Sequence, residues 1–185
     1  MDIFTAFGLS ASAGLNAYIP LLVVALIARF TDLIALSSPW NTLENWWVIG
    51  ALVVLSLVEF FADKLPAINH ANDLIQSFIR PAAGAVVFSA SANMAEIHPV
   101  LAMVAGLLVA GSIHAVKSIA VRPMITATTG GAGNLPVSIL EDVVSTTLSI
   151  LAIVIPVLIG AVVILVVSWI IWRMYRKASQ RASTQ

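Results

Sequence analysis

Two adjacent carboxylates, Glu141 and Asp142, lie inside a stretch of sequence that is otherwise almost entirely apolar. The stretch covers residues 135–172, and these two side chains are its only formal charges. Hydrocarbon cannot hydrogen-bond a carboxylate, so an acid inside a membrane costs at least about 2.5 kcal/mol. Such acids face protein or water, and the chemistry they predict is the loading and release of charge.

A polar stripe accompanies this pair. Ser138, Glu141 and Ser145 share one face of a helix, with Asp142 at its edge. A charged stripe cannot face lipid, so we expect it to face the interior of a helical bundle. The stripe fits a solute pathway and a structural polar core equally well.

His114 and Lys117, three residues apart, are candidate counter-charges. We expect them to pair with Glu141 and Asp142, because mutual pairing removes much of the cost of burying charge. The alternatives are that His114 is a simple interhelical hydrogen-bond partner and that Lys117 extends to the membrane surface.

Glu59 and Asp63 form a second acidic pair, four residues apart on one helix face and next to Lys64. One interpretation is a cation or proton site. We favour the other interpretation, a helix end with solvated charges, because Lys64 and Pro66 are typical of a membrane boundary.

The sequence contains a candidate internal repeat. Residues 9–21 align without gaps with residues 125–137, and three pairs are identical: Ala11/Ala127, Gly14/Gly130 and Pro20/Pro136. A second echo relates residues 70–81 to residues 114–123. Transporters often build sites from duplicated broken helices, although small residues also align by chance. We predict parallel halves over residues 8–95 and 97–175.

Each repeat copy predicts a helix break with its own chemistry. Proline suits the first turn of a helix, so new helices should begin near Pro20 and Pro136. Two such N-termini facing each other would hold an anion. Alternatively, Asn16 and Asn134 cap the new helices.

Composition places the chain in a membrane. It is 60% hydrophobic and 10% charged over 185 residues, with a mean hydropathy of +1.01, whereas soluble domains carry about 25% charged residues. The net charge of zero gives no electrostatic basis for binding nucleic acid. Without cysteine, catalytic motifs or a metal-ligand set, we expect no enzyme, no cofactor and no metal site.

We predict an all-α, polytopic transmembrane bundle of about six spans in a single membrane domain, residues 1–185. The expected spans cover residues 18–36, 46–61, 82–95, 100–121, 136–155 and 156–172. Residues 3–13 are too short to span and are either re-entrant or peripheral. A short amphipathic helix is expected at 70–79, ended by Arg80-Pro81, and a break at 124–134.

Positive charge predicts the orientation. Lys64, Arg80, Lys117 and Arg122 fall on one side together with the polar tail 176–185, so we expect both termini in the cytoplasm of a bacterial inner membrane. Arg29 is the exception and should extend toward the outer surface. The small residues of 82–95 favour close helix packing and a homodimer.

Several motifs together resemble a known family. They are GLNAYIP (14–20), Glu59 with DKLP (63–66), FIRP (78–81) with AGA (83–85), HAVK (114–117), and Asn134 with Ser138, Glu141 and Asp142. The combination is similar to the integral membrane family called domain of unknown function 4126, over residues 8–175. That family has no established activity, so the resemblance implies topology and motif positions but no substrate.

The sequence leaves three functions open. The first is a transporter or channel for a small polar or ionic solute, with proton coupling as an option. The carboxylates that would carry charge are Glu59, Asp63, Glu141 and Asp142. The second is a membrane scaffold in which the polar cluster fixes helix packing. The third is binding of lipid headgroups through Lys64, Arg80, Lys117 and Arg122. In all three, the lipid bilayer is a partner.

Overall fold

The structure is a computed structural model that describes residues 3–64, 66–92, 97–155, 162–173 and 176. Its described part is helical and contains no strand. The elements are α1 (Ile3–Leu15), α2 (Tyr18–Phe30), the 3-10 helix η1 (Trp40–Glu44), α3 (Trp46–Ala62), α4 (Pro66–Ala92), α5 (Pro99–Val116), the π-helical turn η2 (Lys117–Val121), α6 (Arg122–Thr129) and α7 (Asn134–Val154). A further apolar helix covers Val162–Arg173.

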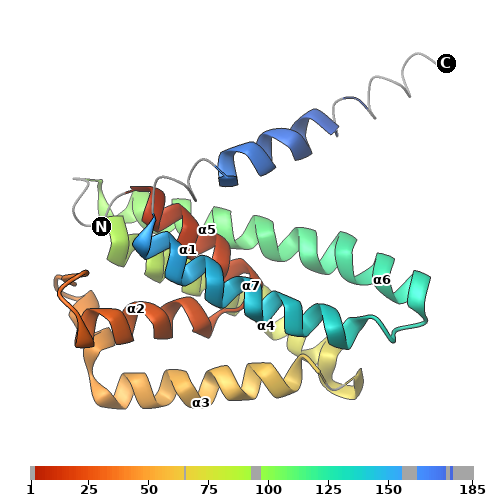
Figure 1. The fold of residues 1–185 in the computed structure, drawn as a ribbon, viewed down its shortest axis with the longest axis horizontal. Coiled ribbons are helices and arrows are strands. Elements are labelled where there is room, and N and C mark those ends of the chain that lie inside the picture. The colour runs from red at the N-terminus through yellow and green to blue at the C-terminus, as the bar shows by residue number, and fades with distance from the viewer. Residues whose placement is uncertain (1–2, 65, 93–96, 156–161, 174–175, 177–185) are drawn as a thin grey trace.

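α1 lies at the centre of the bundle, packed against α4, α5 and α7. Nine of its thirteen residues are buried, mostly Ala, Ser and Gly, and small side chains let membrane helices approach closely. α1 runs inward from one end of the bundle, and α2 returns to that end (Figure 1). Because each has 13 residues, each is only about 20 Å long, less than a hydrocarbon core of about 30 Å. The two helices therefore form a broken helix pair, each too short by itself to cross a membrane, and the pair enters and leaves the bundle at the same end.

The predicted first span over residues 18–36 is wrong. α2 ends at Phe30, and Thr31 has extended backbone angles (φ −139°, ψ 159°). The predicted break before α2 is confirmed, and Pro20 lies in the first turn of the new helix.

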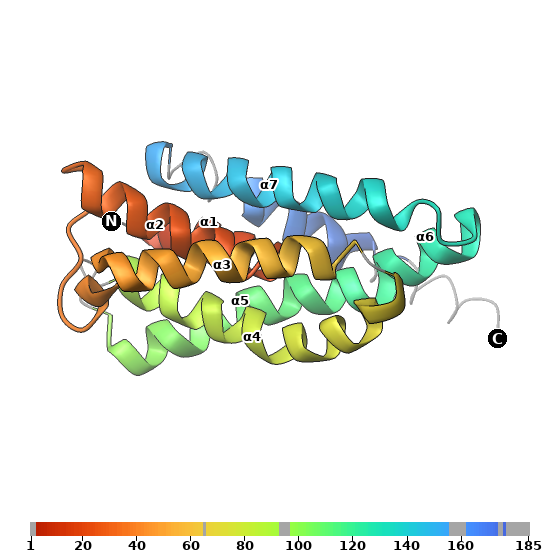
Figure 2. The ribbon, with the colours of Figure 1, turned by 90° about the horizontal axis from the view of Figure 1, so that it is seen from below.

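α4 differs most from the sequence prediction. Instead of a short helix ended by Arg80-Pro81 and a separate span at 82–95, it is one helix of 27 residues with Pro81 inside. Proline removes one backbone hydrogen bond, but neighbouring helices allow membrane helices to continue through it. Gly111 of α5 faces the Pro81 ring, and α4 and α5 lie side by side in opposite directions (Figure 2).

The predicted break at 124–134 is shorter than expected. α5, η2 and α6 form one helical run over Pro99–Thr129. The run ends at Gly130 (φ 62°) and Gly131 (φ 92°), where left-handed backbone angles suit glycine and stop a helix. α7 then begins at Asn134 and ends at Val154, close to the expected 136–155. α3 likewise matches the expected 46–61.

The helices are compatible with a membrane. By length and composition, three stretches of the described residues can cross one: Asn72–Ala92, Pro99–Thr129 and Asn134–Val154. Four other apolar helices are shorter. The count of six spans therefore stays a prediction. The hairpin expected near Pro156 lies outside the described residues.

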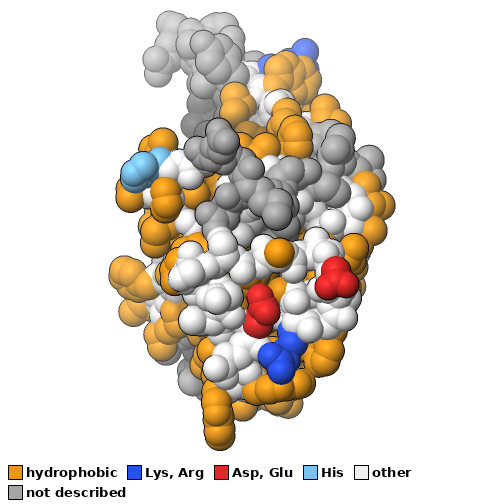
Figure 3. All heavy atoms as spheres, turned by 90° about the vertical axis from the view of Figure 1, so that its left-hand side faces the viewer, with side chains coloured by type: hydrophobic (Ala, Val, Ile, Leu, Met, Phe, Trp, Pro, Cys, Tyr) orange, Lys and Arg blue, Asp and Glu red, His pale blue; other side chains and the backbone are white. Residues whose placement is uncertain are grey.

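The two ends of the bundle differ in charge. The end where α2 stops and α3 begins faces the viewer in Figure 3 and shows few charged side chains. Trp46 and Trp47 are exposed there. Arg29 was expected to extend toward the outer surface. Its side chain instead donates to the Glu44 carbonyl (2.8 Å) and lies over the Trp46 ring. α1 also begins at this end, opposite Lys64 and Arg122; the side that each terminus takes in a membrane stays a prediction.

The two segments of the candidate repeat share a local shape. Each consists of a helix end, a short break and a new helix whose third residue is proline, Pro20 in α2 and Pro136 in α7. The second echo falls on α4 and on α5 with its continuation, which run in opposite directions (Figure 2). That direction does not fit a parallel repeat, and the duplication as a whole stays a prediction.

The closest helix crossing gives a test of the packing. A methyl group at Gly106 would collide with the Gly84 carbonyl and with Phe88. Gly106→Ala should therefore lower the free energy of unfolding by about 1–3 kcal/mol, outweighing a helix-propensity gain of up to about 1 kcal/mol. Gly50→Ala is the matched control, because nothing lies within 4 Å of its added methyl group. Equal melting temperatures for the two variants in detergent would contradict the crossing.

Candidate functional site

Buried ion pairs join four helical segments at one end of the bundle. We call this set of residues the ion network. It contains five carboxylates and four cationic side chains: Glu59, Asp63, Asp73, Glu141 and Asp142 with Lys64, Arg80, Lys117 and Arg122. Because pairing offsets the cost of removing charge from water, the network can persist inside an apolar bundle.

Glu59 connects the network to the break between α1 and α2. Its carboxylate accepts hydrogen bonds from the backbone N–H of Ala17 (3.1 Å to Oε2) and from Arg80 Nη2 (2.9 Å to Oε1). The N-terminus of α2 thereby receives a negative charge, which the helix dipole favours. Glu59 is only 1% exposed, so the favoured interpretation of a solvated helix end is wrong.

Arg80 is fully buried and is the centre of the network. Besides Glu59, it donates to Asp63 Oδ2 (3.2 Å) and contacts His114 Nδ1 (3.3 Å). Arg80 was predicted to lie at a cytoplasmic helix end, because Arg80-Pro81 was expected to terminate a helix. Because α4 continues through Pro81, Arg80 lies inside the bundle instead.

Lys117 makes the predicted pair with Glu141, at 2.8 Å. It also lies 3.6 Å from Asp63 and donates to the Leu15 carbonyl at the end of α1 (3.2 Å). A cation suits that position, because the last carbonyls of a helix lack intrahelical partners. Lys117 opens the π-helical turn η2, a feature that often occurs at functional sites.

Asp142 takes a different partner from the one expected. Its two oxygens accept from Lys64 Nζ (2.8 Å) and from Asn16 Nδ2 (3.0 Å). The Asn16 side chain also accepts from the backbone N–H groups of Tyr18 and Ile19, both at 3.1 Å. Asn16 therefore caps α2, as one hypothesis proposed, and ties the cap to α7.

His114 does not pair with Glu141 or Asp142. It contacts Arg80 and Ser77 (3.1 Å to Nε2), which is closer to the simpler interpretation of an interhelical hydrogen-bond partner.

The hypothesis of two facing helix N-termini is wrong. The N-terminus of α2 is already occupied by Glu59 and Asn16. The N-terminus of α7 lies at the far end of the bundle (Figure 1), where Asn134 Nδ2 donates to Thr126 (3.0 Å) instead of capping. Gly14 serves packing, because a methyl group there would collide with Ala110 and Ile113 of α5.

The polar stripe of α7 is buried, as expected. Beyond the carboxylates it becomes a serine seam, in which Ser12 of α1 lies 2.8 Å from Ser145 Oγ and 2.7 Å from Ser149 Oγ. This part of the stripe holds two helices together. Ser138, one turn before Glu141, is 1% exposed, and its hydroxyl has no hydrogen-bond partner among the described residues.

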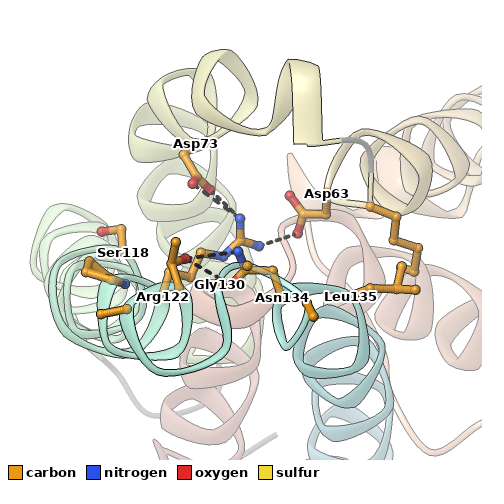
Figure 4. A pocket seen from close by; sticks show the side chains of 13 residues that line it. Asp63, Asp73, Ser118, Arg122, Gly130, Asn134 and Leu135 are labelled. Carbon is orange, nitrogen blue, oxygen red and sulfur yellow. Dashed lines mark hydrogen bonds and ion pairs between the residues drawn. The ribbon is translucent and has the colours of Figure 1, made fainter.

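A pocket of about 870 Å³ adjoins the network at its outer edge (Figure 4). Its charged lining residues are Asp63, Lys64, Asp73 and Arg122. Arg122 bridges the two acids, with Nη1 at 3.1 Å from Asp73 and Nη2 at 3.2 Å from Asp63. The glycine turn before α7 forms the opposite wall.

The cationic face expected for lipid headgroups finds no support in the geometry. Lys64, Arg80, Lys117 and Arg122 do not form an exposed cationic face, since Arg80 and Lys117 are buried in ion pairs. Among the described residues, no group of three or more His, Asp or Glu side chains is arranged to hold a metal ion.

Apolar helices long enough to cross a membrane, packed around buried charge, are compatible with a helical membrane protein. The model of the family described as domain of unknown function 4126 matches residues 3–177, so the chain belongs to that family. No curated protein and no solved structure matches the chain.

The position of Arg80 gives a direct test of the network. Arg80→Gln leaves Glu59 buried without its cation, so it should lower the free energy of unfolding by about 3–5 kcal/mol. Arg29→Gln removes an exposed arginine whose partners are one carbonyl and one ring, and it should lower the free energy of unfolding by about 1 kcal/mol or less. Unfolding in mixed detergent measures both. Similar losses in the two variants would contradict a buried role for Arg80.

Proposed function

We propose that the protein is a transporter or channel for a small polar or ionic solute. The observation that carries this proposal is a continuous chain of charged and polar contacts from the pocket to the break between α1 and α2. Non-helical backbone at membrane depth occurs where protein or a water-filled cavity satisfies it. Intramembrane acids and bases commonly mark solute pathways.

The route would begin at the pocket, whose lining includes Asp63 and Lys64. Behind Lys64 lies Asp142, and behind Asp142 lies Asn16 at the break between α1 and α2. Two consecutive contacts thus lead from the pocket to the middle of the bundle. A passing solute would exchange partners with the Lys64–Asp142 pair, which retains slight exposure (11% and 12%).

Coupling to protons would use the same carboxylates. Glu141 and Asp142 lie side by side on α7 but pair with different cations, Lys117 and Lys64. Protonation of either acid would weaken its pair and free a lysine for the solute. A bacterial inner membrane with the charged end toward the cytoplasm remains part of this proposal.

The alternative function is a scaffold, and one observation favours it. Each cation of the network already has a carboxylate partner within 3.2 Å. Paired charges of this kind can fix the register of helices without moving anything.

Cysteine labelling separates the two functions, because the chain has no native cysteine. Thiolate chemistry requires water, so a membrane-impermeant thiol reagent reports solvent access. If the pathway opens, Ser138→Cys should react when the reagent is added at the charged end. Asp142→Cys should react as well.

Two matched variants serve as the positive and negative controls for this labelling. Thr128→Cys is exposed on α6 and should react fully, whereas Ser149→Cys lies in the dry serine seam and should stay unreactive. A folded Ser138→Cys protein that is as inert as Ser149→Cys from both sides would sink the transport proposal and leave the scaffold.

A further inference from the structure

We propose that the pocket binds a small zwitterion, whose ammonium group lies against Asp73 and whose anionic group lies toward Arg122 and the glycine turn. This inference deepens the proposed function, and rests on it, by naming the class of solute. The pocket lies between the end of α3, the first half of α4 and the turn from α6 to α7.

The balance of charge in the pocket selects this class. Its charged lining residues are two acids, Asp63 and Asp73, and two bases, Lys64 and Arg122. Their formal charges cancel, so a lone anion or a lone cation would bring an uncompensated charge into a partly buried site. The Asp63 side chain is only 2% exposed, so bulk water does not stabilise an extra charge placed beside it. A zwitterion adds no net charge.

The charges are also separated in space. Figure 4 shows Asp73 and Asp63 on one side of the Arg122 guanidinium, and Gly130 and Asn134 on the other. Asp73 is the most accessible of the acids in the network, at 22%, and so presents oxygen atoms to an incoming ammonium group. The arrangement gives the pocket an acidic wall and a wall suited to an anion.

The anionic wall has room and a favourable field. A methyl group added at Gly130 would meet nothing within 4 Å, so the backbone of the turn is open to the pocket. α7 begins at Asn134, which also lines the pocket, and a helix N-terminus attracts negative charge. Arg122 supplies the formal positive charge, with the planar donor geometry that suits carboxylate and phosphate groups.

Two sources can supply this chemistry. A free amino acid is one, and the ethanolamine phosphate headgroup of a membrane lipid is the other. The volume of about 870 Å³ accommodates either.

Thermal unfolding of the purified full-length protein, followed by tryptophan fluorescence, tests the inference. The free-solute arm compares L-alanine with propionate and with ethylamine, which each carry only one of its two charges. The lipid arm compares nanodiscs of phosphatidylglycerol with nanodiscs that also contain phosphatidylethanolamine. A ligand at about ten times its dissociation constant should raise the melting temperature by about 3 °C or more.

A steric block controls for binding elsewhere. Ala127 lines the pocket and is exposed on α6, so Ala127→Trp should fill the pocket without disturbing the core. Thr128→Trp places the same side chain on the next exposed residue, outside the lining. The rise should persist in Thr128→Trp and disappear in Ala127→Trp.

A rise with alanine supports a free solute, and a rise only with phosphatidylethanolamine supports a headgroup. An equal rise with propionate or ethylamine, a rise that survives in Ala127→Trp, or no rise in either arm would overturn the inference. Labelling of Ser138→Cys does not depend on the ligand. Labelling without any zwitterion effect would therefore refute this inference alone and leave the proposed function standing.

Discussion

The Glu59 carboxylate binds both the Ala17 backbone N–H and the Arg80 guanidinium, and so joins the break between α1 and α2 to the ion network. A helix that stops halfway through an apolar bundle must satisfy its free N–H groups without water. Asn16 accepts two of these N–H groups, and Glu59 accepts that of Ala17 with a formal charge. That charge in turn requires a buried arginine. Arg80 then recruits Asp63, and Asp63 lies within reach of Lys117 and Arg122. The ion network follows from one broken helix.

The sequence was sufficient to predict the helical class, the break before Pro20 and the positions of α3 and α7. These depend on local rules of hydropathy, proline and glycine. The sequence was not sufficient to predict α4 as one continuous helix, because whether a helix continues through Pro81 depends on contacts with α5. Nor did it predict that residues 3–15 occupy the centre, since a short, small-residue segment gains that position only from the helices around it.

The same limit applies to the site. Glu141 and Lys117 were paired correctly from the cost of buried charge, and Asn16 was a candidate cap from its position. Arg80 and Arg122 were taken for surface residues, because one wrong helix end moved Arg80 out of the bundle and a predicted break moved Arg122 to its edge. The signal in the sequence that points to Arg80 is electrostatic, since Glu59 and Asp63 on one helix face require a cation.

Hydrogen exchange at the broken helix tests this central role of Glu59 most directly. Glu59→Gln should weaken the cap, because a charged acceptor holds the Ala17 N–H more strongly than a neutral amide does. We predict that amide exchange across residues 14–19 rises about tenfold or more, while exchange in residues 100–110 of α5 stays unchanged. Unchanged exchange at the break, or an equal rise in both segments, would contradict the account.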